Sequence, residues 1–104
     1  MKQNKIESLL GLCMRAGRLA SGEFAAEEAV KAGNACLVIA ATDASANTRK
    51  LFHDKCSFYE VPCVVYGTKE SLGRCIGKEM RASIAVLDEG FAKSIIKHLE
   101  GLNE

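Results

Sequence analysis

The chain has 104 residues, of which 48% are hydrophobic and 26% are charged. This composition is that of an ordinary folded protein and excludes a disordered or fibrous class. A chain of this length can bury roughly two-thirds of its unfolded surface without metals or disulfides, so we expect a single domain over residues 1–104. The net charge of +1 gives no global sign of a nucleic-acid partner, although it is compatible with a local basic face.

Two further features indicate where the protein resides. No apolar run reaches the roughly 18 residues that span a bilayer, and the start of the chain leads into amphipathic sequence, so we expect a cytoplasmic protein with no membrane partner. The five cysteines are odd in number and never spaced as Cys-x-x-Cys, which predicts neither a disulfide framework nor a zinc site. We expect them to be buried in a reducing compartment, and we expect no metal and no cofactor.

The first half of the chain predicts helices around a buried strand. Asn4 can cap a first helix that ends at Gly17, and Ser21 can cap a second helix that ends at Gly33. The run 35–41 has no polar member, so a strand there would be covered by helices on both faces. The polar residues 42–45 then lead into a third helix that ends at about Tyr59.

The second half continues the alternation of strand and helix. A strand is predicted from Val61 to Tyr66, and Thr68 can cap a short helix that follows it. The last strand is predicted from Ile84 to Leu87, and Asp88 can cap a final helix. Strands alternating with helices of this length predict the α/β class and a three-layer α/β/α sandwich.

Few motifs in the sequence point to catalysis. The chain has neither Gly-x-Gly-x-x-Gly nor a Walker-type phosphate loop, and the pair Gly73 and Gly77 is explained by helix packing or capping. Asp43 and Ser45 leave the carboxyl end of the buried strand, where open α/β sheets place ligands. The same residue types are ordinary helix caps, and a serine nucleophile would need an elbow motif that is absent. We therefore expect a non-catalytic protein.

Three segments together resemble a known family. They are LGLCMRAGRLASG at 10–22, LVIAATDASANT at 37–48, and VPCVVY at 61–66 followed by LGRCIGK at 72–78. In this order they resemble the L7Ae family of kink-turn-binding ribosomal proteins, most closely its bacterial YlxQ-like branch. The resemblance covers nearly the whole chain and implies an α/β/α sandwich around a mixed four-stranded sheet. It also implies a short edge strand at Leu19 and Ala20, a structured RNA such as ribosomal RNA as partner, and a monomer.

The resemblance also implies a contact surface. Archetypal members bind kink-turn RNA, a bulged bend flanked by sheared G·A pairs, with the start of the second helix and two nearby loops. The positions of this chain that match the surface are Gly22, Glu23, Phe24, Ala25 and Glu28 on the helix, Asp43, Ala44 and Ser45 after the strand, and Lys78, Glu79, Met80, Arg81 and Ala82 before the last strand, with Arg18 nearby.

The chain departs from the family pattern at the helix start. Archetypal members read Gly-x-Asn-Glu-x-x-Lys there, whereas this chain reads GEFAAEE at 22–28, so the three base-reading side chains are absent. A good side-chain contact to a base edge is worth about 1 to 3 kcal/mol in DNA complexes, and Glu28 in place of lysine adds repulsion from phosphate. Phe24 either stacks on an unpaired base or packs toward the core.

Two functions therefore compete. The first is binding of a structured RNA, supported by basic residues that are expected to gather at one edge of the sandwich, namely Arg15, Arg18, Arg49, Lys50, Arg74, Lys78 and Arg81. The alternative is a protein-binding adaptor in which Glu23, Glu27 and Glu28 face a basic protein. An enzyme, the third class, would have to use Asp43 with Ser45, or a cysteine of lowered pKa.

Overall fold

The computed structural model describes residues 4–101, which form five helices and four strands. In chain order these are α1 (Lys5–Arg15), β1 (Leu19–Ser21), α2 (Glu23–Lys31), β2 (Leu37–Ala40), α3 (Ala46–Tyr59), β3 (Cys63–Val65), α4 (Lys69–Cys75), β4 (Ser83–Val86) and α5 (Glu89–Gly101). Among the described residues no helix is long and apolar enough to cross a lipid bilayer.

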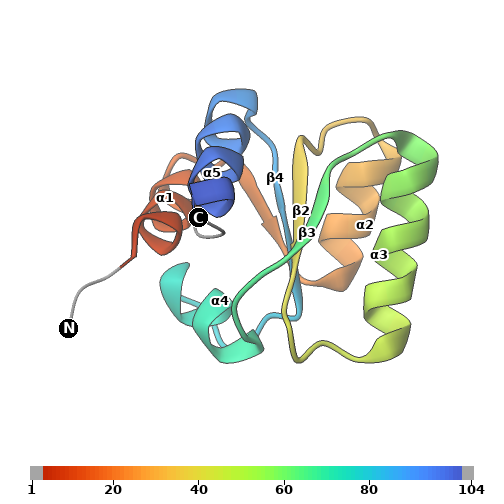
Figure 1. The fold of residues 1–104 in the computed structure, drawn as a ribbon, viewed down its shortest axis with the longest axis horizontal. Coiled ribbons are helices and arrows are strands. Elements are labelled where there is room, and N and C mark those ends of the chain that lie inside the picture. The colour runs from red at the N-terminus through yellow and green to blue at the C-terminus, as the bar shows by residue number, and fades with distance from the viewer. Residues whose placement is uncertain (1–3, 102–104) are drawn as a thin grey trace.

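The four strands form one mixed sheet in the order β1-β4-β2-β3. β4 runs antiparallel to both β1 and β2, and β3 runs parallel to β2. Helices α2 and α3 cover one face of the sheet, while α1, α4 and α5 cover the other (Figure 1). The predicted three-layer sandwich around a mixed four-stranded sheet is therefore confirmed.

The two central strands, β2 and β4, explain why the sheet needs helices on both faces. Every residue of both strands is buried. Side chains alternate between the faces, so that Leu37 and Ile39 pack with α1, α4 and α5, whereas Val38 packs with Phe52 of α3. An apolar strand such as 35–41 is stable only where both of its faces are removed from water, as the sequence predicted.

The connection between the first two helices differs in one respect from the prediction. Leu19–Ser21 forms the short edge strand that the family resemblance implied, with Ser21 opposite Ile84 of β4. The predicted Ser21 cap is wrong, because Gly22 occupies the N-cap position of α2 and supplies no side-chain hydrogen bond. Pairing with β4 holds Ser21 in extended backbone, and that partner lies some 60 residues away in the sequence.

The predicted caps at the starts of the other helices are confirmed. The Oδ1 atom of Asn4 accepts a hydrogen bond from the N–H of Glu7 at 2.7 Å, and Ser45 caps α3 in the same way at 3.1 Å. Thr68 caps α4 in a reciprocal capping box, and Asp88 accepts from an N–H in the first turn of α5 at 2.9 Å. These short polar side chains satisfy backbone donors that a helix leaves unpaired at its start.

Candidate nucleic-acid interface

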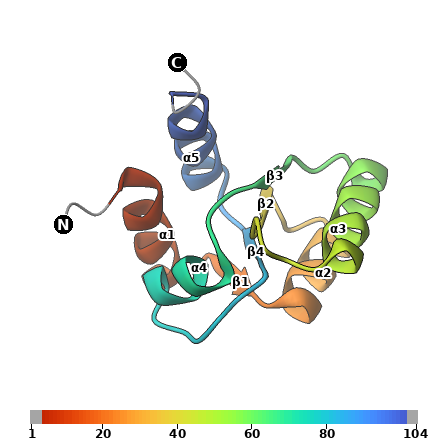
Figure 2. The same cartoon turned by 60° about the horizontal axis from the view of Figure 1, so that its bottom comes forward.

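The three segments predicted to bind RNA meet at one end of the sandwich, at the bottom of Figure 1 and toward the viewer in Figure 2. We call it the lower end and define it by residues 22–25, 42–45 and 78–82. β2 ends there and β4 begins there, because the two strands are antiparallel. The N–H of Gly22 donates to the carbonyl of Ser83 at 2.9 Å, and the N–H of Ala41 donates to the carbonyl of Ala82 at 2.8 Å.

The first residue of α4 links the two loops of the lower end. The N–H of Lys69 donates to Oδ1 of Asp43 at 2.8 Å, and the carbonyl of Lys69 accepts from the N–H of Arg81 at 3.0 Å. Arg81 in turn donates from Nε to Oγ of Ser21 at 3.4 Å, beside the start of α2. Asp43 thus accepts from the first backbone N–H of α4, whose N-cap is Thr68, and the expectation that Asp43 caps the helix that follows it in the chain is wrong.

A second chain of hydrogen bonds joins the starts of α2 and α3. The hydroxyl of Ser45 accepts from the N–H of Thr48 and donates to Oγ1 of Thr48 at 3.0 Å. Thr48 Oγ1 donates to Oε1 of Glu23 at 2.9 Å. Asp43 and Ser45 are therefore both engaged in holding helix starts, and the lower end is a closed network in which each segment is fixed by its neighbours.

Gly22 leaves open space in front of α2. Its φ of 95° lies in the region that side chains rarely adopt, and a Cβ built there would meet no atom within 4 Å. Gly22 at the N-cap has no side chain, so it accepts no hydrogen bond from the backbone N–H groups in the first turn of α2. A phosphate can approach these donors at the positive end of the helix dipole.

The loop 78–82 lies directly on α4. A Cβ on Gly73 would lie 1.8 Å from the carbonyl oxygen of Glu79, and the carbonyl of Gly73 accepts from the N–H of Lys78 at 2.8 Å. Gly77, with φ of 73°, lets the chain turn out of the helix. The two glycines thus have the packing and capping origins that the sequence suggested, and together they fix the position of the loop.

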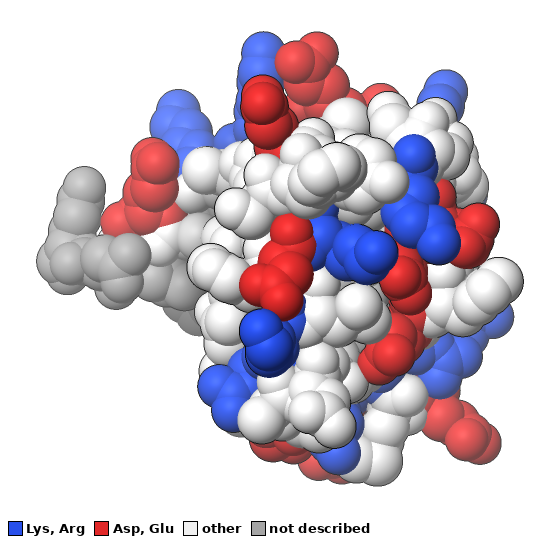
Figure 3. Space-filling view, turned by 90° about the vertical axis from the view of Figure 1, so that its right-hand side faces the viewer, with Lys and Arg blue, Asp and Glu red and all other residues white. Residues whose placement is uncertain are grey.

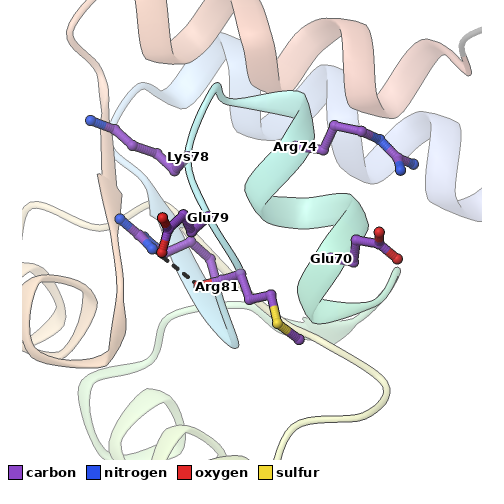
Figure 4. A pocket seen from close by; sticks show the side chains of 6 residues that line it. Glu70, Arg74, Lys78, Glu79 and Arg81 are labelled. Carbon is purple, nitrogen blue, oxygen red and sulfur yellow. Dashed lines mark hydrogen bonds between the residues drawn. The ribbon is translucent and has the colours of Figure 1, made fainter.

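A pocket of about 480 Å³ lies between α4 and this loop (Figure 4). Its lining residues are Glu70, Arg74, Lys78, Glu79, Met80 and Arg81. In Figure 4, Lys78 and Arg81 extend toward one side, whereas Arg74 extends toward the other. Among residues 4–101, none of these three cations belongs to an ion pair. Three members of the predicted basic edge therefore line this pocket together with the two carboxylates of Glu70 and Glu79, and none of the three cations is within ion-pair distance of either.

The outer face of α2 and α3 has a different electrostatic character. Figure 3 shows basic and acidic side chains interspersed on this side of the molecule. Lys50, which the sequence assigned to the basic edge, pairs with Asp54 at 3.1 Å. Glu28 pairs with Lys31 at 3.4 Å. A third pair joins Lys55 and Glu27 at 4.0 Å. Glu27 and Glu28 of α2 are therefore each paired with a lysine at the surface, where such pairs contribute little stability.

Two large apolar side chains are exposed at the lower end. Phe24 is 77% exposed and Met80 is 58% exposed. The core-facing alternative for Phe24 is wrong, because the inward face of α2 is formed by Ala26, Ala29 and Val30. Phe24 lies in the first turn and points away from the sheet. Ala44, also assigned to the contact surface, is buried, so it supports the loop and offers little side-chain surface.

Comparison with known proteins gives a family match. The model of the family described as "Ribosomal protein L7Ae/L30e/S12e/Gadd45 family" matches residues 4–96. "RNA-binding protein YlxQ" of Bacillus subtilis (strain 168) is 44% identical over 92 residues, covering 88% of this chain and 92% of the relative. The protein of the same description from Enterococcus faecium is 39% identical over 99 residues, covering 95% of each chain.

Solved structures agree with the fold. A protein of unknown function from Bacillus halodurans C superposes with a TM-score of 0.88 at 42% identity, over 91% of this chain and 96% of that chain. The Giardia lamblia 15.5kD RNA binding protein superposes with a TM-score of 0.76 at 22% identity, over 98% of this chain and 93% of that chain. At that low identity the second likeness shows the shared fold alone.

Proposed function

The chain belongs to the ribosomal protein L7Ae/L30e/S12e/Gadd45 family, and from that premise we propose that it is a non-catalytic RNA-binding protein whose lower end contacts a structured RNA. The similarity to two bacterial proteins described as RNA-binding, over most of each chain, supports this function most directly. The joining of the three predicted contact segments by direct hydrogen bonds supports the location.

The lower end offers two kinds of group to a phosphate backbone. Lys78 and Arg81 supply positive charge, and within residues 4–101 neither forms an ion pair, although Glu79 lies in the same loop. The uncapped start of α2 supplies N–H donors, and Gly22 allows a close approach. Contacts of this kind supply affinity and orientation without reading sequence, and their strength falls steeply with salt.

We propose further that the bound RNA contains a sharp bend of the kink-turn type, and that ribosomal RNA is the natural class in which to seek it. Such a bend brings phosphates from both arms to one place, which matches a small contact surface formed by three segments. Because the Asn, Glu and Lys of the family pattern are absent at 24, 25 and 28, backbone and loop contacts would supply the recognition.

The test is fluorescence anisotropy of a labelled kink-turn RNA and of a control in which the G·A pairs are replaced, each at about 50 and 200 mM salt. We expect tight binding with a clear preference for the intact kink-turn at both salt concentrations. Equal binding to both RNAs would contradict the kink-turn part of the proposal. An absence of binding to either RNA would contradict RNA binding at this surface.

A further inference from the structure

The exposed phenylalanine at the start of α2 contributes little to the fold. Phe24 is the second residue of the helix and is 77% exposed, so most of its ring remains in water. Burial of such a side chain would stabilise the protein, and this position forgoes most of that gain. Single exposed apolar residues are common on protein surfaces, so the significance of Phe24 depends on what surrounds it.

The surroundings of Phe24 leave its ring accessible. Gly22, two residues earlier, has no side chain and faces open space. The Glu23 carboxylate is held toward α3 by the hydroxyl of Thr48 at 2.9 Å. Thr48 therefore keeps the neighbouring negative charge engaged, while the aromatic side chain projects into solvent.

The loop that joins this helix start adds complementary chemistry. Arg81 contacts Ser21 just before α2, and the adjacent Met80 is 58% exposed. Lys78 and Arg81 extend from the same loop toward one side (Figure 4). A flat aromatic ring, a polarisable thioether and two cations outside any ion pair are thus presented by two connected segments, with the carboxylate of Glu79 in the same loop. This combination suits an unpaired nucleobase and its flanking phosphates, because bases stack on aromatic side chains and phosphates pair with lysine and arginine.

We propose that Phe24 stacks on a nucleobase that is unpaired and extruded from the bound RNA, while Lys78 and Arg81 bind the phosphates on either side of it. This inference rests on the proposed RNA-binding function and names a feature of the ligand, an unpaired base beside the bend. It also accounts for the departure from the family pattern, since the position that reads a G·A pair in archetypal members carries an aromatic side chain here. Stacking tolerates any base, so the identity of the extruded base should matter little.

The first part of the test compares Phe24→Ala with Phe58→Ala. Phe58 is a matched control, because it is 78% exposed and lies near the far end of α3. The ligand is a kink-turn RNA with one unpaired loop nucleotide, and a second RNA has an abasic site at that nucleotide. We expect Phe24→Ala to weaken binding about 10- to 100-fold and Phe58→Ala to leave it unchanged. The abasic RNA should bind the wild-type protein about as weakly as the intact RNA binds Phe24→Ala.

The second part uses the fact that the chain contains no tryptophan. Phe24→Trp should retain tight binding, and the intact RNA, but not the abasic RNA, should quench its fluorescence. Phe58→Trp should show no quenching by either RNA. Because both positions are exposed, thermal unfolding should be nearly the same for all four variants, so a loss of binding cannot be attributed to unfolding.

The outcomes separate this inference from the function on which it rests. Equal binding of wild type and Phe24→Ala to the intact RNA would overturn the stacking site and leave RNA binding in place. Equal quenching of Phe24→Trp fluorescence by the intact and the abasic RNA would also overturn the stacking site. If the wild type binds neither RNA, the proposed function itself fails and the inference fails with it.

Discussion

The two ends of the α2 and α3 layer carry phenylalanines of nearly equal exposure in very different surroundings. Phe24 at the lower end is 77% exposed, and Phe58 near the opposite end is 78% exposed. Phe58 packs edge to face with Tyr59, with ring centroids 4.9 Å apart. Phe24 has no such aromatic pair within residues 4–101 and is adjacent to the segment that Arg81 contacts. Exposure alone therefore does not identify a binding residue.

The direction of the chain explains much of this difference. Helices α2, α3 and α4 all begin at the lower end, because β1, β2 and β3 end there. Helix starts carry partial positive charge and helix ends carry partial negative charge. At the opposite end, α2 and α3 terminate, with Gly33 and Glu60 in left-handed conformation after them. The lower end is thus suited to anions through its topology as well as through its side chains.

The largest expected effect comes from disrupting the close packing between α4 and the loop 78–82. In Gly73→Ala the new Cβ would lie 1.8 Å from a backbone oxygen of Glu79, so the loop must move. We expect a loss of about 3 kcal/mol in the free energy of unfolding, measured with urea, together with weaker RNA binding. Gly101→Ala, where a Cβ meets no atom within 4 Å, is the control and should be at least as stable as wild type. Similar stability of Gly73→Ala and wild type would show that the loop is not held by this contact.

Restoring a positive charge on α2 should strengthen binding. Glu28→Lys puts lysine where the family pattern has one and removes the pair with Lys31, which is exposed and contributes little stability. We expect an increase of about tenfold in RNA affinity and a steeper dependence on salt, measured by anisotropy. Glu100→Lys makes the same charge change in the last turn of α5 and should have a much smaller effect. An equal gain in both variants would indicate attraction by net charge without a defined contact.

Removing a cation from the loop should have a smaller effect in the opposite direction. Arg81→Ala should lower RNA affinity by about three- to tenfold. It should also reduce the slope of log affinity against log salt concentration by about one, as expected for the loss of one phosphate contact. Lys93→Ala, in α5 beside Glu60 and Pro62, is the control and should bind as wild type does. A salt dependence that is the same for Arg81→Ala and wild type would exclude Arg81 from phosphate binding.

The last prediction concerns the reactivity of two thiols on opposite sides of the molecule. Burial, and secondarily the charge of Glu7, raises the pKa of Cys75 in α4 to about 11. A hydrogen bond from the Cys56 thiol lowers the pKa of Cys63 in β3. The thiolate is the reactive form, so at pH 8 iodoacetamide should modify Cys63 at least about tenfold faster than Cys75, as peptide mass spectrometry can show. The rate at Cys75 should keep rising to about pH 11. Faster modification of Cys75 at pH 8 would refute this order.

Local signals in the sequence were sufficient for three of the four strands and most caps, whereas the edge strand β1 was implied only by the family resemblance. The apolar run 35–41 predicted β2, and Asn4, Ser45 and Thr68 cap the helices that follow them because their hydrogen-bond partners are three residues away. The failures involve distant partners. Ser21 is held by pairing with Ile84, so the start of α2 shifts to Gly22.

The candidate site was predictable mainly through the family resemblance. Its segments are far apart in the chain, and contacts such as that of Asp43 with Lys69 follow from the tertiary fold. The sequence left open whether Phe24 faces the core or solvent, and the structure decides this through the burial of Ala26, Ala29 and Val30 on the inward face of α2. The engagement of Glu23 by Thr48 joins two helices and had no signal in either segment.

The most direct test of the account is a titration of isotope-labelled protein with kink-turn RNA, followed by amide chemical shifts in nuclear magnetic resonance spectra. We expect the largest changes at 22–25, 42–45 and 78–82, with little change at Phe58 and Tyr59. Changes concentrated around Phe58 and Tyr59, with an unperturbed lower end, would contradict the assignment of RNA binding to the end where α2, α3 and α4 begin.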